Sequence, residues 1–315
     1  MAELSAEDLV SILAGDPDEL QVHLELIERD VAVDGHLVRV HCHCLTVDGN
    51  GRVKPHRLAE FMRNAVADYA VPKSQLADAR ARDHQFRSTS ATAELHQQAI
   101  RAFTDLEKSG EGGEMLLFLL AERFLKLPQV LCKMDLKTDT RMHYHGADGI
   151  YAGVTDEGVL KLFWGESKVY QDASTAIRDC LAALSPFLTE HDHEGAERER
   201  DLILLSDKAD LSDPKLTDAF KRYFDSKTPQ SNRVEYCGLA LVGFNASFYP
   251  ADGTKALADA LAESARQGLL NWTKQIGNRL TAEKLDQVHI EFFCVPLPCV
   301  DQFRSAFRTS LGLDK

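Results

Sequence analysis

The chain has 315 residues, 44% of them hydrophobic, so it can bury a large core either as one elaborated domain or as two smaller ones. It contains no run of about eighteen apolar residues, and its first residues are acidic rather than basic and then apolar, so we expect neither a membrane span nor a secretory signal. A formal net charge of -13 argues against non-specific adhesion to nucleic acid through a basic surface.

The number and spacing of the cysteines indicate the redox compartment in which the protein works. The seven cysteines show no framework spacing, and an odd number suits reduced thiols in a reducing compartment better than disulfides. We therefore expect a cytoplasmic protein without a membrane partner.

The N-terminal residues predict a helix followed by a strand hairpin. Leu4 to Ala14 has the composition of a short helix, with Ser5 as its N-cap. Apolar and polar residues alternate from Leu20 to Glu28 and again from His36 to Val47, as they do in half-buried strands. The pair Asp34-Gly35 between these segments is typical of a turn.

The second of these strands carries His41-Cys42-His43-Cys44, whose residue types are those of zinc ligands. On a strand the two histidines point to one face and the two cysteines to the other, so these four residues cannot complete one tetrahedral site. We favour a packed strand with two small buried thiols, and a metal site is the alternative.

Two helices and a polar segment are expected next. Pro55 to Tyr69 is amphipathic, and Thr92 to Leu106 is a second helix. We interpret Lys73 to Ser90 between them as a solvated loop or helix face, with a phosphate-contacting edge as the alternative. Its basic residues are Lys73, Arg80, Arg82, His84 and Arg87. The run from Glu107 to Gly113 is the clearest flexible break, so we end an N-terminal region, residues 1–110, there.

A strongly apolar helix and two strands follow the break. Gly113 to Leu127 is predicted to be helical, and it carries Glu114 on its first turn, where a negative charge is favoured. Val130 to Leu136 is a short strand, and His145 to Val154 is a second strand with Asp148 near its start.

Leu160 to Gln171 is predicted to be a strand buried on both faces, because five of its first six residues are apolar, aromatic or Gly. Thr155 to Gly158 forms a hairpin turn before it, which allows Asp148 to lie beside Glu166. Glu166 and Lys168 share one face, because side chains alternate along a strand. Buried charges cost several kcal/mol unless they are paired or bound to metal. Catalysis is one explanation, and a partly buried salt bridge without chemistry is the other.

Histidine-bearing segments lie on both sides of this core. We place His143 and His145 on a strand or loop surface, with an approach to a metal or phosphate as the alternative. The charged run at 191–200, which contains His191 and His193, is interpreted as a solvated linker, with adventitious metal binding as the alternative.

Helices and strands alternate in the rest of the chain. Ala173 to Leu184 has helical spacing and is expected to end at Pro186, and the apolar run Asp201 to Leu205 is predicted to be a strand. The later predicted elements are a helix at Leu216–Phe224, a strand at Val234–Phe244, a helix within Gly253–Ile276, a strand at Val288–Pro296 and a helix at Cys299–Leu311. We therefore predict an α/β (α+β) fold with a mixed sheet flanked by helices. Helicase motifs are absent from the sequence, so any ATP-driven step belongs to a partner.

The predicted elements follow the order helix, three strands, helix and strand. The first helix and the second strand each carry an acid, and the third strand carries E-x-K. This arrangement resembles the PD-(D/E)xK nuclease core. Ala147 stands where that motif has proline. The segments HGADGI and GESKVY are similar to the HamA family, nuclease subunits of the Hachiman anti-phage defence system that work with a helicase. The resemblance implies a nuclease core at residues 111–206 and a C-terminal α/β extension at 207–315.

The resemblance also implies roles for individual residues. Asp148 and Glu166, joined by the Ser167 carbonyl, are the expected ligands of Mg²⁺, with Mn²⁺ as a substitute, because magnesium prefers hard oxygen ligands. Lys168 is expected to orient the attacking water or to stabilise the developing charge. Glu114 is expected to support a second metal ion or to hold Lys168 by an ion pair.

The function expected from this resemblance is metal-dependent hydrolysis of phosphodiester bonds, with DNA as the substrate and a helicase as the partner in the defence complex. Gln171 is a further candidate, which would steady the lysine or a phosphate. The alternative is a catalytically inactive nuclease-fold adaptor that binds a helicase or nucleic acid, and the acidic composition suits a protein partner.

Overall fold

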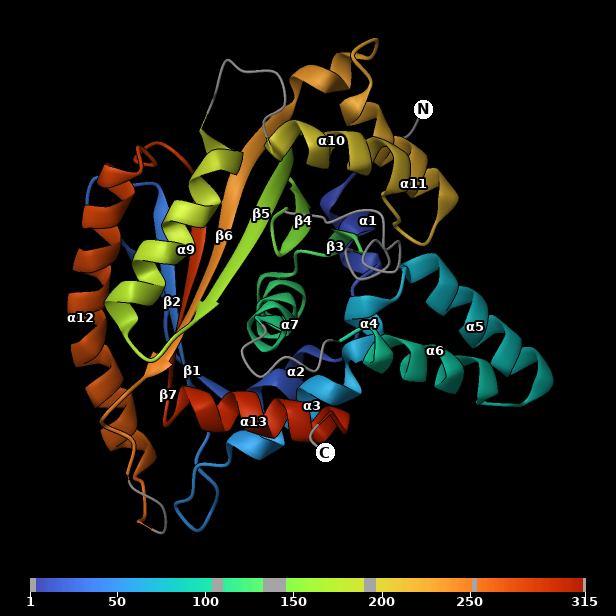
Figure 1. The fold of residues 1–315 in the computed structure, drawn as a ribbon. Helices are drawn as coiled ribbons and strands as arrows, with labels where there is room; N and C mark the ends of the chain where they lie inside the picture. The colour runs from blue at the N-terminus through green and yellow to red at the C-terminus, as the bar shows by residue number, and fades with distance from the viewer. Residues whose placement is uncertain (1–3, 104–109, 133–145, 190–196, 251–253, 314–315) are drawn as a thin grey trace.

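The computed structural model describes residues 4–103, 110–132, 146–189, 197–250 and 254–313. Within these residues one seven-stranded sheet runs through the molecule, with helices on both of its faces (Figure 1). The strands are β1 (Leu24–Ala32), β2 (Val38–Leu45), β3 (Gln129–Leu131), β4 (Gly149–Val154), β5 (Leu160–Val169), β6 (Val234–Asn245) and β7 (Ile290–Leu297).

The sheet is mixed, and the order of its strands is β1-β2-β7-β6-β5-β4-β3. Strands β2, β7, β6 and β5 are parallel, whereas β1, β4 and β3 are antiparallel to their neighbours. The predicted α/β (α+β) class with a mixed sheet is confirmed. Residues 1–110, 111–206 and 207–315 all contribute strands to this sheet, and β6 and β7 separate the N-terminal hairpin from β5.

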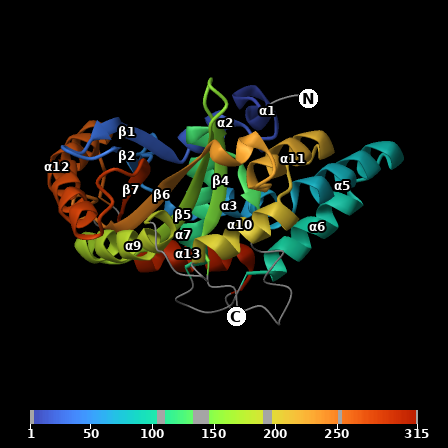
Figure 2. The ribbon, with the colours of Figure 1, turned by 90° about the horizontal axis from the view of Figure 1, so that it is seen from above.

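Helices pack on both faces of the sheet, and alternate residues of each central strand enter two hydrophobic clusters. One cluster contains side chains of α9 and α12, and the other contains side chains of α3, α4, α7 and α13. The helix bounds are α1 (Ala6–Ser11), α2 (Pro17–Gln21), α3 (Pro55–Asn64), α4 (Val66–Ala70), α5 (Lys73–Phe86), α6 (Ser90–Arg101), α7 (Glu111–Leu119), the π-helical turn η1 (Leu120–Leu125), α9 (Ala173–Leu188), α10 (Glu197–Lys208), α11 (Pro214–Lys221), the 3₁₀ turns η2 (Arg222–Phe224) and η3 (Pro229–Asn232), α12 (Ala258–Ala282) and α13 (Val300–Leu311). Helices α5 and α6 project together from the side of the sheet (Figures 1 and 2).

The structure confirms the helix cap and the two turns that individual residues of the sequence predicted. Ser5 caps α1, because its side-chain oxygen accepts a hydrogen bond from the backbone N–H of Asp8 at 3.2 Å. Gly35, with φ of +79°, turns the chain between β1 and β2. The β4–β5 hairpin closes through a hydrogen bond from the N–H of Thr155 to the carbonyl of Val159 at 3.0 Å.

The prediction of a strand at Asp201–Leu205 was wrong, because this run lies inside helix α10. Asp201 and Leu205 are buried, whereas Ile203 between them is 69% exposed. The buried pair is four residues apart, which is the spacing of one helical face. A five-residue apolar run is compatible with either structure, and packing on the sheet selects the helix.

Three boundaries also differ from the prediction. The expected strand at Leu20–Glu28 begins only at Leu24, because α2 occupies the preceding residues. The expected helix at Pro55–Tyr69 is broken at Ala65 into α3 and α4. Helix α9 continues past Pro186 to Leu188, where Phe187 and Leu188 are buried. Proline in the last turn of a helix disrupts little hydrogen bonding, and the burial of these two side chains stabilises the extension.

The remaining expectations are met only in part within the described residues. The polar segment beginning at Lys73 is helical, as one of its interpretations required. The apolar helix ends in the π-helical turn η1, and β3 is shorter than the predicted strand. His143, His145, His191 and His193 lie outside the described residues. Over the described ranges, no helix is both long and apolar enough to span a bilayer.

We expect Asp201→Ala to lower the free energy of unfolding by about 1–3 kcal/mol. The buried Asp201 carboxylate accepts a hydrogen bond from the indole N–H of Trp164 at 2.9 Å, and the substitution leaves that donor buried without this acceptor. Urea unfolding measures the change. Asp207→Ala, on the exposed side of the same helix, is the control and should change stability by less than about 0.5 kcal/mol. Equal stability of the two variants would contradict the argument.

Candidate functional site

The carboxyl end of β5 carries an ion pair between Lys168 and Glu166. Both side chains are largely buried, with 24% and 8% of their surfaces exposed. Burial opposes the charged ammonium, but the adjacent Glu166 carboxylate outweighs burial and raises the pKa of Lys168 above its ordinary value. Lys168 therefore stays charged at neutral pH.

Asp148 joins this strand end from the start of β4. Its backbone N–H donates to the carbonyl of Gly165 at 2.7 Å, which continues the β4–β5 ladder by one residue. Its Oδ2 atom accepts hydrogen bonds from the N–H and the hydroxyl of Ser167 at 2.8 and 2.7 Å. The structure thus brings Asp148 to the strand end that carries Glu166 and Lys168.

Glu114 reaches the neighbourhood of this strand end through the first turn of α7. Gly113 allows a close approach, because a Cβ atom at this position would lie 2.9 Å from Val169 Cγ2 and 3.1 Å from Ser167 Oγ. The Glu114 carboxylate accepts a hydrogen bond from the hydroxyl of Tyr69 at 2.9 Å. The contact that holds Glu114 in place therefore comes from a tyrosine of α4, and it is a contact that the sequence did not predict.

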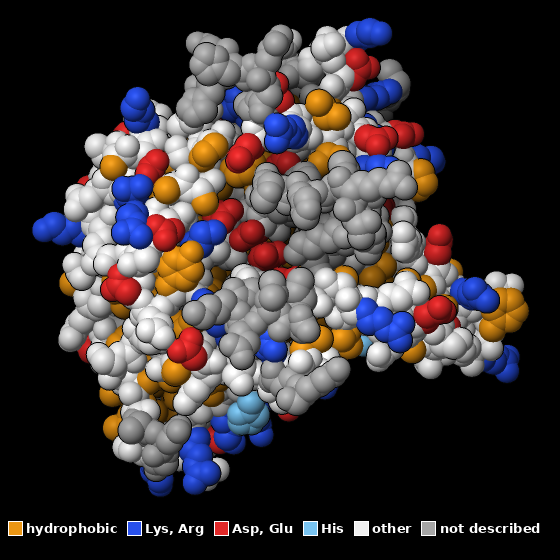
Figure 3. All heavy atoms as spheres, in the orientation of Figure 1, with side chains coloured by type: hydrophobic (Ala, Val, Ile, Leu, Met, Phe, Trp, Pro, Cys, Tyr) orange, Lys and Arg blue, Asp and Glu red, His pale blue; other side chains and the backbone are white. Residues whose placement is uncertain are grey.

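The four predicted residues thus gather at the carboxyl end of β5, beside the start of β4 and the start of α7. Figure 3 shows acidic side chains grouped near the centre of one face, next to residues that the structure does not describe. The carboxylates and the ammonium come from β5, from α7 and from the residue before β4.

These carboxylates do not form a compact cluster of ligand atoms. In the described residues, sets of at least three ligand atoms within 4.8 Å of one another occur at Glu235/Cys237/His289 and at Asp30/His41/Glu291. The acids at the end of β5 are in neither set. The chemistry of the donors nonetheless suits Mg²⁺, because carboxylate oxygens are hard ligands. Oδ1 of Asp148 accepts no hydrogen bond from the described part of the chain, so it is available to a cation.

Comparison with models of protein families shows which family this chain belongs to. A family model described as HamA matches residues 21–311, nearly the whole chain. The chain belongs to the HamA family. Membership of this family makes it a protein of the Hachiman anti-phage defence system, as the sequence resemblance implied. No curated protein matches the chain.

Two buried tyrosines next to the acids of this HamA-family chain were missed by sequence reasoning. Burial raises the pKa of both Tyr69 and Tyr151, and the negative charges of Glu114 and Asp148 add to the effect in each case. The hydroxyl of Tyr151 has no hydrogen-bond partner among the described residues. Tyr151 has apolar neighbours on both sides along β4, and no local pattern indicates that its hydroxyl lies close to carboxylates.

The C-terminal helix α13 also contacts the strand end. Arg304 donates a hydrogen bond to the carbonyl of Val169, the last residue of β5. Gln171 donates from Nε2 to Asp301 Oδ2 at 2.8 Å, so its side chain is directed to α13. Arg304 therefore binds the backbone of the residue that follows Lys168, and no local motif distinguished it from the other arginines in the sequence.

The side chains of the His-Cys segment of β2 and of the basic segment that begins at Lys73 pack against or pair with other residues of the protein. The alternation predicted for His41-Cys42-His43-Cys44 is observed, since the two cysteines enter one hydrophobic cluster and His41 contacts Phe293 of the other. His41 Nε2 lies 2.7 Å from Glu291 Oε2. In the basic segment, Lys73 pairs with the buried Glu122 at 2.7 Å. The seven cysteines are free thiols.

We expect Gly113→Ala to lower the free energy of unfolding by about 1–2 kcal/mol, although alanine is the better helix former by about 1 kcal/mol. The added methyl group would overlap Val169 and Ser167 and force α7 away from β5. Thermal and urea unfolding measure the effect. Gly49→Ala is the control, because a Cβ atom there meets no atom within 4 Å. A Gly113→Ala protein more stable than the wild type would show that α7 does not approach β5 so closely.

Proposed function

We propose that this member of the HamA family is a metal-dependent nuclease that hydrolyses phosphodiester bonds. The observation that supports the proposal most strongly is the meeting of Asp148, Glu166 and Lys168 at the end of β5, within a protein of a defence-system family. Two carboxylates from adjacent strands and one ammonium have the donor and charge pattern that phosphodiester hydrolysis requires.

The residues around the strand end hold these groups in position. The two hydrogen bonds from Ser167 fix the Asp148 carboxylate, and Lys168 balances the charge of the buried Glu166. Glu114 is oriented by the hydroxyl of Tyr69. Such preorganisation favours catalysis because the groups need little rearrangement when substrate binds.

Asp148 and Glu166, with the Ser167 carbonyl, would hold Mg²⁺ or Mn²⁺ in this proposal, and Glu114 would support a second ion. A cation bound there would offset the charge of the scissile phosphate and lower the pKa of a bound water molecule. Lys168 would orient the attacking water or stabilise the negative charge that develops on the phosphate, because its ammonium is already held beside the carboxylates.

The proposed substrate and the proposed partner rest on the family and on the net charge of the chain. We propose DNA as the substrate and a helicase of the same defence system as the partner. The net charge of -13 makes autonomous binding to a polyanion weak, so a partner that delivers nucleic acid would complement this chain.

Cleavage of supercoiled plasmid with Mg²⁺, with EDTA and by Lys168→Gln tests the proposal. Glutamine keeps a hydrogen bond to Glu166 but removes the charge, and we expect cleavage to fall by about 100-fold or more. Melting temperatures establish that the variant is folded. Lys215→Ala is the matched control, because Asp213 and Lys215 repeat the acid-x-lysine spacing at an exposed helix start. Wild-type rates in Lys168→Gln would refute the assignment of this residue.

Metal binding is tested without cleavage, by titrating Mn²⁺ into the protein in a calorimeter. We expect Asp148→Asn to weaken binding about tenfold or more, since it removes one anionic ligand. Asp156→Asn, in the exposed β4–β5 turn, should bind Mn²⁺ as the wild type does. A wild type that binds no Mn²⁺, and that remains inactive with the helicase partner present, would favour the inactive adaptor instead.

A further inference from the structure

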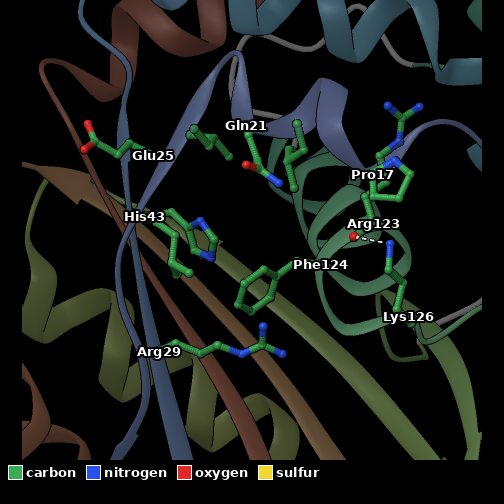
Figure 4. A pocket seen from close by; sticks show the side chains of 11 residues that line it. Pro17, Gln21, Glu25, Arg29, His43, Arg123, Phe124 and Lys126 are labelled. Atoms are coloured by element: carbon green, nitrogen blue, oxygen red, sulfur yellow. Dashed lines mark hydrogen bonds between the residues drawn. The ribbon is translucent and has the colours of Figure 1, made fainter.

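A pocket of about 480 Å³ lies between β1, β2 and the end of the π-helical turn η1 (Figure 4). This volume is within the usual range for small-molecule sites, about 300–1,000 Å³. Leu20, Leu24 and Phe124 provide apolar walls, and His43, Arg29 and Lys126 are the polar side chains that matter below. None of these residues belongs to the site at the end of β5.

His43 is the clearest sign that the pocket is built for a ligand. His43 is only 2% exposed, and neither ring nitrogen has a hydrogen-bond partner among the described residues. Burial, with His41 and Arg29 nearby, lowers the pKa of His43 to about 3, so the ring is neutral and offers one donor and one acceptor. Its ring packs edge-on to Phe124 and lines the pocket (Figure 4). An unpaired buried polar group costs about 1–3 kcal/mol, and a ligand in the pocket would recover that cost.

Cations border the same pocket in a chain whose overall charge is strongly negative. The Lys126 ammonium donates to the carbonyl of Arg123 at 2.9 Å and pairs with no carboxylate in the described residues. Arg29 lies over the ring of Phe124, with its Cζ 4.7 Å from the ring centroid, and its side chain is 55% exposed. Arg123 is already bound to Glu19 at 2.7 Å. Arg29 pairs through Nε with Asp30 Oδ2 at 3.4 Å, so the Lys126 ammonium and the two Nη groups of Arg29 are the cationic donors available to an anionic ligand.

The backbone around the pocket is irregular on both sides. Phe124 belongs to a π-helical turn. Such turns are rare in proteins as a whole, but many of those that occur lie at functional sites. Lys126 follows with φ of +61°, and Asp30, next to Arg29, has φ of +55° within a bulged stretch of β1. Non-glycine residues in this conformation are strained, and such strain persists where surrounding structure imposes it.

We propose that this pocket binds a nucleoside monophosphate. A neutral imidazole between apolar walls matches the hydrogen-bonding edge of a flat heterocycle, and an ammonium with a guanidinium matches a phosphate. A plain inorganic anion would leave the apolar walls and His43 without a partner, and an uncharged ring would leave Lys126 without an anionic partner. This site is independent of the proposed nuclease.

Calorimetric titration of the full chain with each common nucleoside 5′-monophosphate tests the proposal, with the matching nucleosides and inorganic phosphate titrated separately. EDTA in the buffer prevents phosphate from binding through a metal ion at the end of β5. We expect at least one monophosphate to bind, and its nucleoside and inorganic phosphate to bind about tenfold more weakly or worse.

Two substitutions separate ligand binding from structure. His43→Leu removes an unpartnered polar group, so we expect the melting temperature to stay equal or rise while nucleotide affinity falls about tenfold. Lys126→Gly relieves a positive φ angle and should also preserve or raise the melting temperature while affinity falls by a similar factor. Lys284→Gly is the matched control: this lysine also has φ of +61° but lies outside the pocket, so affinity should not change.

Lys168→Gln should bind the nucleotide as the wild type does, which separates this pocket from the nuclease site. The proposal is overturned if no nucleoside monophosphate binds, if inorganic phosphate binds as tightly as the nucleotide, or if His43→Leu and Lys126→Gly keep wild-type affinity.

Discussion

Charged groups at the end of a buried strand must be neutralised inside the protein, and this constraint organises the edge of the sheet around β5. Apart from Lys161, which pairs with Glu235, the strand is apolar up to Trp164 and then carries Glu166, Ser167 and Lys168. Lys168 neutralises Glu166, and Ser167 binds Asp148. Neither carboxylate is therefore left without a counter-charge or a donor, which lowers the cost of burying these groups.

The sheet topology makes this site depend on the whole chain. The parallel strands β6 and β7, from the C-terminal third, lie between β5 and the N-terminal hairpin, so the hairpin completes the sheet only after the last strand is in place. Helix α13 then returns to the end of β5, where Arg304 binds the carbonyl of Val169. The residues outside the expected nuclease core therefore support its edge directly, and they are more than an appended extension.

One helical segment connects the two places where chemistry concentrates. Helix α7 begins beside Ser167 and carries Glu114, and Phe124 near the end of its continuation η1 lines the cationic pocket. Its middle is buried and apolar, which makes the segment a rigid spacer. The two proposals therefore place a cation site at one end of this segment and an anion site at the other.

The sequence by itself determined the features that depend on neighbouring residues. Turn residues and apolar alternation predicted the β4–β5 hairpin, and the period of a strand placed Glu166 and Lys168 on one face. Tertiary structure alone decided that Asp201–Leu205 is a helix, that Tyr69 binds Glu114 and that His43 faces a pocket. These outcomes rest on contacts between distant segments, whose energies exceed local preferences and leave no periodic pattern in the sequence.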